Sequence, residues 1–241
     1  MIRITVLIII AFSISGCVSN QADPVIDETR KVLKVGDTDL FYGITIPDSY
    51  QYEKPVPLIL ALHYGGNFSD YYGRSFAKQL IEPGLGQLGA IVISPTCPYL
   101  NWTTDISEKA VIGLINFILS EYSIDKEKII VTGFSLGGAG TWHFASKYPE
   151  LFSIAIPIAG PVWSFDLEFL KNILAPVYVI HSRDDEAVPF QVVEETVNLL
   201  SYYGIYIEFR ILEGMYHYEV SNYTPFLREA IPWIYSVWDQ N

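Results

Sequence analysis

Residues 129–142 read IIVTGFSLGGAGTW, and this stretch decides how the chain is expected to fold. The β-branched run at 129–132 predicts a buried strand, and the small residues from Gly137 onward predict the start of a helix. Ser135 lies between them, inside the pattern Gly-X-Ser-X-Gly. Glycines two residues before and two residues after the serine let the strand and the helix approach closely. A serine at such a strand–turn–helix corner presents its hydroxyl group as a nucleophile.

Candidates for an acid and a base follow Ser135 along the chain. Asp185 lies in a loop after the apolar run 176–180, and His217 lies in a loop after the apolar run 205–212. Loops that follow strand ends are where an open α/β sheet gathers its active site. We therefore expect His217 to take the proton from Ser135, and Asp185 to orient the imidazole.

A serine nucleophile also needs two backbone N–H groups that stabilise the oxyanion. Leu136, which follows the nucleophile, is expected to supply the first of them. The second is expected from the loop at 62–67, after the third strand.

Several aromatic residues lie in or near loops that are expected to face the site. Tyr64, Trp102 and Trp163 are predicted to contact the substrate, whereas Phe134 and Trp142 are expected to pack under the corner. The carboxylates at 184–186 have no His or Cys beside them at ligand spacing, so no metal site is expected. No cofactor is expected.

The order of predicted elements indicates an α/β fold. Apolar runs at 58–62, 90–94 and 153–159 are suited to buried strands, and they alternate with helical patterns at 106–122, 189–202 and 223–238. The stretches 31–35 and 39–46 predict an antiparallel N-terminal hairpin. We expect a mostly parallel central sheet with helices on both faces. Between residues 160 and 176 only a short helix near 165–172 fits, so no large lid is expected.

The N-terminus carries the features of a secretory leader. Arg3 is followed by an apolar run at 4–14, and small residues precede Cys17. This run is too short to cross a bilayer as a helix. The residues before Cys17 resemble the lipobox of bacterial lipoproteins, which implies cleavage after residue 16 and lipidation of Cys17. Residues 17–29 are then a lipidated tether, residues 30–241 the folded domain, and the protein is expected in the cell envelope.

The charge of the chain limits its partners. The full sequence has a net charge of −12, and loss of Arg3 with the leader leaves 14 Lys and Arg against 27 Asp and Glu. Such an acidic chain is a poor partner for nucleic acid and is repelled by anionic lipid. Association with a membrane is therefore expected through the lipid alone.

Three segments together resemble a known family. These are 133–157, with its GGAGTW and YPELF runs, 95–98 (PTCP), and 181–189 (HSRDDEAVP). The stretch 58–238 resembles single-domain α/β-hydrolases of the carboxylesterase, dienelactone hydrolase and "predicted peptidase" group. The resemblance implies this fold and a serine-hydrolase triad.

The same resemblance bears on two individual residues. The segment after His181 is similar to an HGxxDxxVP pattern whose aspartate falls on Asp185, with Asp184 as the alternative acid. Aligning His63 with the family histidine implies Gly65 as the second oxyanion donor. Tyr64 occupies a position where many members have glycine, so the alignment of this loop, and with it the position of the second donor, stays open by one residue.

These observations leave three hypotheses for function. The first is a serine esterase that cleaves a carboxylic ester, either in a small molecule or on a polymer, through an acyl-enzyme. The second is a serine peptidase on the same fold. The third is a surface binding module that has lost catalysis, although Ser135, Asp185 and His217 are all retained.

Overall fold

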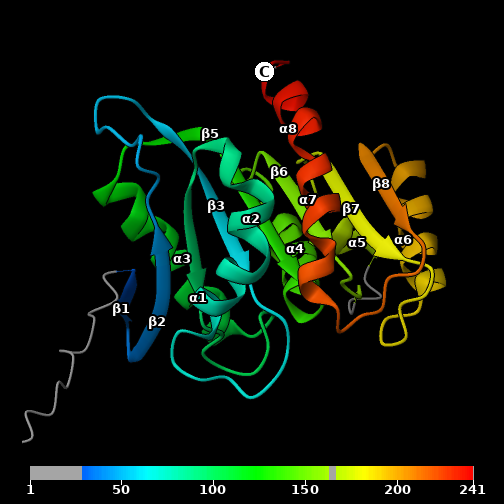
Figure 1. Ribbon diagram of the computed structural model, residues 1–241, viewed down its shortest axis with the longest axis horizontal. Helices are drawn as coiled ribbons and strands as arrows, with labels where there is room; N and C mark the ends of the chain where they lie inside the picture. The colour runs from blue at the N-terminus through cyan, green and yellow to red at the C-terminus, as the bar shows by residue number, and fades with distance from the viewer. Residues whose placement is uncertain (1–28, 163–166, 241) are drawn as a thin grey trace, which may run out of the picture.

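A single mixed sheet runs through the centre of the computed structural model, which describes residues 29–162 and 167–240 (Figure 1). Its strands, in chain order, are β1 (Arg30–Val35), β2 (Thr38–Thr45), β3 (Val56–Leu62), β4 (Ile91–Pro95), β5 (Ile124–Phe134), β6 (Ile154–Ile158), β7 (Val177–Ser182) and β8 (Ile207–Leu212). Across the sheet they lie in the order β1-β2-β4-β3-β5-β6-β7-β8.

Strand direction divides the sheet into two parts. β1 pairs with β2, and β2 pairs with β4, in antiparallel fashion, whereas the strands from β4 to β8 are parallel. The predicted mostly parallel sheet with an antiparallel N-terminal hairpin is confirmed. The chain passes from β3 to β4 on one side and then returns to place β5 on the other side of β3. Such a switch point is where an open α/β sheet binds its ligand.

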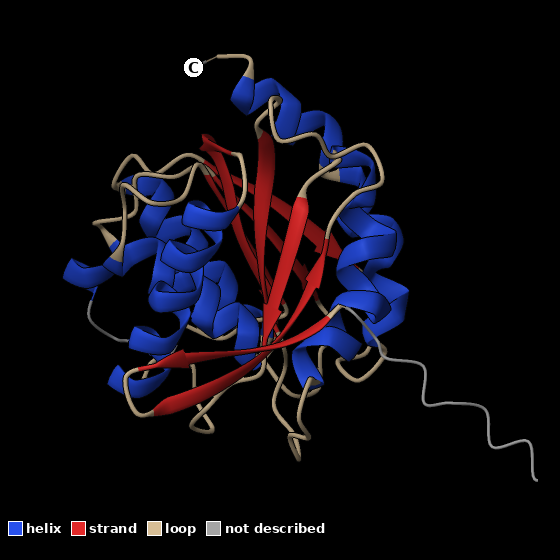
Figure 2. Cartoon of the chain, turned by 90° about the vertical axis from the view of Figure 1, so that its left-hand side faces the viewer, coloured by secondary structure: helices blue, strands red, loops and turns tan. Residues whose placement is uncertain are grey.

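Helices cover both faces of the sheet (Figure 2). One buried apolar cluster joins the sheet to α3 (Asp105–Glu121), α4 (Leu136–Lys147), α5 (Leu167–Leu170) and α6 (Phe190–Tyr202). The other joins it to α1 (Tyr72–Phe76), η1 (Ala77–Ile81), α2 (Glu82–Leu85), η3 (Val220–Tyr223), α7 (Thr224–Glu229) and α8 (Ile231–Trp238), with η2 (Gly86–Leu88) before β4. The central strands β3, β4 and β6 are nearly all apolar because both of their faces are buried.

The helices differ from the expected ones in two places. Residues 72–88 form a helical run that no periodic pattern in the sequence predicts. The single helix expected at 223–238 is instead α7 and α8, which meet at Ala230. Pro232 lies in the first turn of α8, where its missing N–H is tolerated, whereas inside one continuous helix it would clash with the preceding turn.

Among the described residues between β6 and β7, the only helix is the short α5, and the first residues of the helix expected near 165–172 lie outside the described part of the chain. The predicted leader at 1–16, Cys17 and most of the proposed tether lie outside the described residues. Within the described part of the chain, none of the helices combines the length and apolarity needed to cross a membrane.

Candidate active site

Ser135 occupies a strained corner between β5 and α4. Its φ angle is 55° and its ψ angle is −114°, a conformation that is rare outside glycine. The flanking glycine makes this corner possible, because a Cβ atom on Gly137 would lie 1.8 Å from the carbonyl oxygen of Leu62. Backbone strain of this kind is found where a side chain must be held for function.

His217 bridges the serine and an aspartate. Its Nε2 atom lies 2.8 Å from Ser135 Oγ, and its Nδ1 atom lies 2.8 Å from Asp185 Oδ2. A carboxylate can only accept at this distance, so the imidazole proton sits on Nδ1 and leaves Nε2 free to accept from the serine hydroxyl. The three predicted residues thus come together in the arrangement that activates a serine.

Asp185 is held as a carboxylate. Its Oδ1 atom accepts hydrogen bonds from the backbone N–H groups of Ala187 (3.0 Å) and Val188 (2.7 Å). Burial raises the pKa of Asp185, but the hydrogen bonds from His217 and these N–H groups outweigh it, so the pKa is lowered overall. The negative charge that orients the imidazole is therefore stabilised.

The carboxylates on either side of Asp185 hold the histidine loop instead. Asp184 Oδ2 accepts from the N–H of Gly214 at 2.6 Å, and Glu186 Oε2 accepts from the N–H of His217 at 2.9 Å. The geometry therefore places Asp185, and not Asp184, against the imidazole. Three consecutive acidic residues fasten the loop after β7 to the loop after β8.

His63 organises the loop after β3, where the second oxyanion donor is expected. This fully buried histidine accepts at Nε2 from the N–H of Cys97 (2.9 Å), and its Nδ1 then donates to the carbonyl oxygen of Tyr64 (2.7 Å). The Tyr64–Gly65 peptide bond is trans, so the N–H of Gly65 points away from the His63 ring. Gly65 and Ser135 line the same cavity.

The first expected donor, the N–H of Leu136, lies at the start of α4. An N–H in the first turn of a helix has no partner within that helix. The positive end of the helix dipole lies there as well, which favours a developing oxyanion. The roles of Leu136 and Gly65 as oxyanion donors stay predictions.

The three aromatic residues predicted to contact substrate have different outcomes. Tyr64 lines the cavity, and its hydroxyl donates to Gln79 Oε1 at 2.9 Å. Trp102 is fully buried, and its Nε1 donates to the carbonyl oxygen of His63 at 3.0 Å, so its assignment to substrate binding is corrected to a structural role. Its side chain turns inward because Gly140 leaves space for it: a Cβ atom there would lie 2.8 Å from Trp102 Cβ. Trp163 lies outside the described residues.

The cavity beside Ser135 has a volume of about 630 Å³. Several of its lining residues were not predicted from the sequence, namely Gln79, Ala187, Val188, Val192, Tyr218 and Val220. The sequence carries a signal for some of them, since Val188 belongs to the quoted 181–189 pattern and Tyr218 follows His217. Gln79 carries none, because it comes from the helical run that was not predicted. None of the described residues that line this cavity is Lys or Arg.

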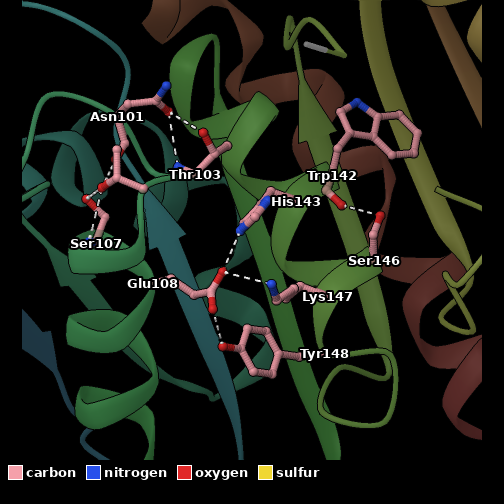
Figure 3. A network of polar contacts seen from close by, with 10 residues as sticks. Asn101, Thr103, Ser107, Glu108, Trp142, His143, Ser146, Lys147 and Tyr148 are labelled. Atoms are coloured by element: carbon pink, nitrogen blue, oxygen red, sulfur yellow. Dashed lines mark hydrogen bonds and ion pairs between the residues drawn. The ribbon is translucent and has the colours of Figure 1, made fainter. Parts of the chain in front are cut away.

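Glu108 fastens helix α4, which begins directly after Ser135 (Figure 3). This half-buried carboxylate on α3 contacts His143 Nε2 at 3.0 Å, accepts from the Tyr148 hydroxyl at 2.8 Å and lies 3.9 Å from Lys147 Nζ. His143 is therefore engaged with α3 and does not reach the serine. Within the described residues, no three His, Cys, Asp or Glu side chains are grouped so as to hold a metal ion.

Together, the sheet order, the serine corner after β5 and the loops carrying Asp185 and His217 define an α/β-hydrolase fold. The profile of the dienelactone hydrolase family matches residues 101–224, which is just over half of the chain. The chain belongs to the dienelactone hydrolase family.

Similar proteins include fungal esterases. The chain is 35% identical over 148 residues to the probable acetylxylan esterase A of Aspergillus niger, and the match covers 56% of this chain and 46% of that protein. It is 31% identical over 144 residues to acetylxylan esterase A of Aspergillus awamori, covering 54% of this chain and 46% of that protein. The match thus spans less than half the length of these curated relatives.

Solved structures show the same fold. A thermostable esterase superposes with a TM-score of 0.70 at 26% identity, covering 86% of this chain and 62% of the other. Est1E from Butyrivibrio proteoclasticus superposes with a TM-score of 0.68 at 13% identity, covering 86% of this chain and 99% of the other.

Proposed function

We propose that this protein is a serine hydrolase that cleaves neutral carboxylic esters through Ser135, His217 and Asp185. The observation that supports this most directly is the bridging position of His217, 2.8 Å from Ser135 Oγ and 2.8 Å from Asp185 Oδ2. A serine hydroxyl is a weak nucleophile unless a base takes its proton. Membership of a hydrolase family and likeness to esterases point to the same chemistry.

The reaction would proceed in two halves. Ser135 Oγ attacks the ester carbonyl carbon while His217 Nε2 takes its proton, and collapse of the tetrahedral intermediate expels the alcohol with that proton. Water then attacks the acyl-enzyme and gives its proton to His217. The carboxylic acid leaves, and the proton returns to Ser135 Oγ. Asp185 stays ionised and stabilises the imidazolium in both halves.

The backbone N–H groups of Leu136 and Gly65 would stabilise the negative charge on the former carbonyl oxygen. Removing one such donor typically costs about 10²- to 10³-fold in kcat. His63 acts on Gly65 indirectly, because it holds the carbonyl oxygen on the other side of the same peptide bond.

The cavity favours neutral substrates. It offers apolar surface from Phe134, Val188 and Val220, with Tyr64 and Gln79 as a polar wall. A carboxylate on the substrate would find no Lys or Arg among the described lining residues and would approach a chain of net charge −12. Given the similarity to acetylxylan esterases, we propose short acyl esters carried on a saccharide as the substrate class.

The test compares esters and amides on one set of variants. Wild-type protein, Ser135→Ala and, as a matched control, the exposed Ser201→Ala are assayed on p-nitrophenyl acetate, butyrate and octanoate and on a peptide p-nitroanilide. We expect ester turnover by wild type and Ser201→Ala, with kcat lower by about 10⁴-fold or more in Ser135→Ala. Absence of ester turnover by wild type would contradict the proposal. Faster cleavage of the anilide than of the esters would favour the peptidase.

We further propose that the mature chain begins at a lipidated Cys17 and is held at the cell envelope by that lipid. The support is the leader pattern of residues 1–16 and the lipobox-like residues before Cys17. Mass spectrometry of protein expressed in a bacterium should find the acylated N-terminus, and Cys17→Ser should move the protein from the membrane fraction to the soluble fraction. An unmodified Cys17 in a membrane-free protein would contradict this.

A further inference from the structure

A second hollow lies beside the candidate active site, and we call it the aromatic hollow. Its volume is about 490 Å³. It is walled by the tip of the β1–β2 hairpin, by the loop after β3 and by the loop after β4. The mechanism proposed above uses none of the side chains that line this hollow.

The two hollows meet at one loop. Gly65 lines the cavity that holds Ser135, and Gly66 lines the aromatic hollow. Consecutive Cα atoms lie only about 3.8 Å apart. A long substrate whose ester reaches Ser135 can therefore cross this loop and continue into the aromatic hollow.

His63 links the loop after β3 to the loop after β4, and these loops line the two hollows. Its Nδ1 donates to Tyr64 of the catalytic cavity, and its Nε2 accepts from Cys97, which lines the aromatic hollow. The loop after β4 also places Leu100 at a φ angle of 52°, with 74% of its surface exposed. A non-glycine residue in this conformation costs free energy, so the loop is held in shape by its surroundings.

The lining of the aromatic hollow combines flat rings with unpaired polar groups. Phe41, Phe68 and Tyr99 contribute the rings, and Tyr99 is 58% exposed. Asn67 and Asp70 are also exposed, and within the described part of the chain their side chains make no hydrogen bond or ion pair. They are therefore available to a ligand.

This combination matches the chemistry of a sugar. The C–H faces of a sugar ring pack against aromatic rings, and its hydroxyl groups donate to carboxylate and amide oxygens. An anionic ligand fits poorly, since no described residue that lines the hollow is Lys or Arg and Asp70 faces it. We infer that the aromatic hollow binds sugar rings of a saccharide chain whose ester group is presented to Ser135. This inference rests on the proposed function and assigns the place where the saccharide part of its substrate binds.

The kinetic test compares a small ester with a saccharide ester. Wild-type protein, Tyr99→Ala and Asn67→Ala are assayed on p-nitrophenyl acetate and on acetylated xylo-oligosaccharides of one to five sugar units. Tyr52→Ala is the control, because Tyr52 is 65% exposed and does not line the hollow. We expect kcat/KM of wild type to rise with saccharide length. In Tyr99→Ala, kcat/KM for the longer saccharides should fall about tenfold because KM rises. The kcat/KM of the same variant for p-nitrophenyl acetate should stay within about twofold of wild type.

Equal losses on both substrates, or no loss on the saccharides, would overturn the inference. A binding measurement tests the saccharide site independently of the proposed ester hydrolysis. Calorimetry with Ser135→Ala and unsubstituted xylopentaose should show binding that Tyr99→Ala, added to Ser135→Ala, weakens about tenfold. Absence of binding would overturn the saccharide site even if p-nitrophenyl acetate is hydrolysed. Conversely, binding without ester turnover would overturn the proposed function alone.

Discussion

His63 donates a hydrogen bond from Nδ1 to the carbonyl oxygen of Tyr64, at 2.7 Å. This contact sets the direction of the Tyr64–Gly65 peptide and so the direction of the Gly65 N–H. His63 itself has no exposed surface and cannot touch a substrate. If the Gly65 N–H is the oxyanion donor proposed above, His63 is a positioning residue, and its effect should appear in catalysis rather than in substrate binding.

We therefore predict different effects for two isosteric changes of His63. The amide of Asn lies at about the depth of Nδ1 and can still donate to Tyr64, whereas that of Gln lies nearer Nε2 and serves Cys97 instead. His63→Gln should lower kcat about 10- to 100-fold with little change in KM, and His63→Asn should lower it less. Steady-state kinetics on p-nitrophenyl acetate measures this, with His143→Gln as the control. Equal kcat values in both His63 variants would refute the positioning role.

The two neighbouring aspartates should differ sharply. Asp185→Asn leaves the imidazole without its carboxylate and favours the wrong tautomer, so kcat should fall by about 10⁴-fold. Asp184→Asn weakens only the contact with the Gly214 N–H, so kcat should fall less than about tenfold. The comparison needs kcat and a melting curve for each variant. A larger loss in Asp184→Asn would reverse the assignment of the acid.

Acid should destabilise the fold through His63. Burial lowers the pKa of this histidine to about 4, although the hydrogen bond to Tyr64 raises it. In the unfolded chain the pKa of a histidine is about 6.5. Between pH 4 and pH 6.5 the unfolded state therefore binds more protons than the folded state. Neutral His63 therefore adds about 3 kcal/mol to the free energy of unfolding. This stabilisation is complete above about pH 6.5 and is lost as the pH falls towards 4.

Urea unfolding of wild type and His63→Asn at pH 7, 5.5 and 4.5 tests this dependence. The variant should lose less stability than wild type over this range, because its side chain does not titrate. His181 and Asp185, whose pKa values are also lowered, are present in both proteins and cancel in the difference. Identical pH dependence in the two proteins would show that His63 does not contribute to the loss of stability in acid.

Gly137 should be intolerant of any side chain. A Cβ atom there would lie 1.8 Å from the Leu62 carbonyl oxygen, which belongs to the backbone of β3 and cannot move aside cheaply. Gly137→Ala should therefore lower the free energy of unfolding by about 3 kcal/mol. Gly86→Ala is the matched control: its Cβ would meet nothing within 4 Å, and its φ angle of −58° suits alanine. That control should be neutral or stabilising by up to about 1 kcal/mol. Similar losses in the two variants would contradict this account of the corner.

Much of this protein can be predicted from sequence because its signals are local. The strand at 129–132, the glycines around Ser135 and the alternation of apolar runs with helical patterns lie within short windows. They predicted the mixed sheet and its N-terminal hairpin, and both are confirmed. The loops with Asp185 and His217 were found in the same way, since each follows an apolar strand.

Other features depend on residues that are distant in sequence and meet only in the folded chain. Trp102 lies in a polar stretch, yet it is buried because Gly140, on another element, leaves room for its indole. Gln79 enters the cavity from a helical run that has no clear pattern, and Asp184 and Asp185 were separated only by which loop atoms each one reaches. The sequence by itself determined the strands, most of the helices, their order and the chemistry available. The tertiary structure decided which side chains face the cavity, because burial and hydrogen bonding depend on neighbours that no local window contains.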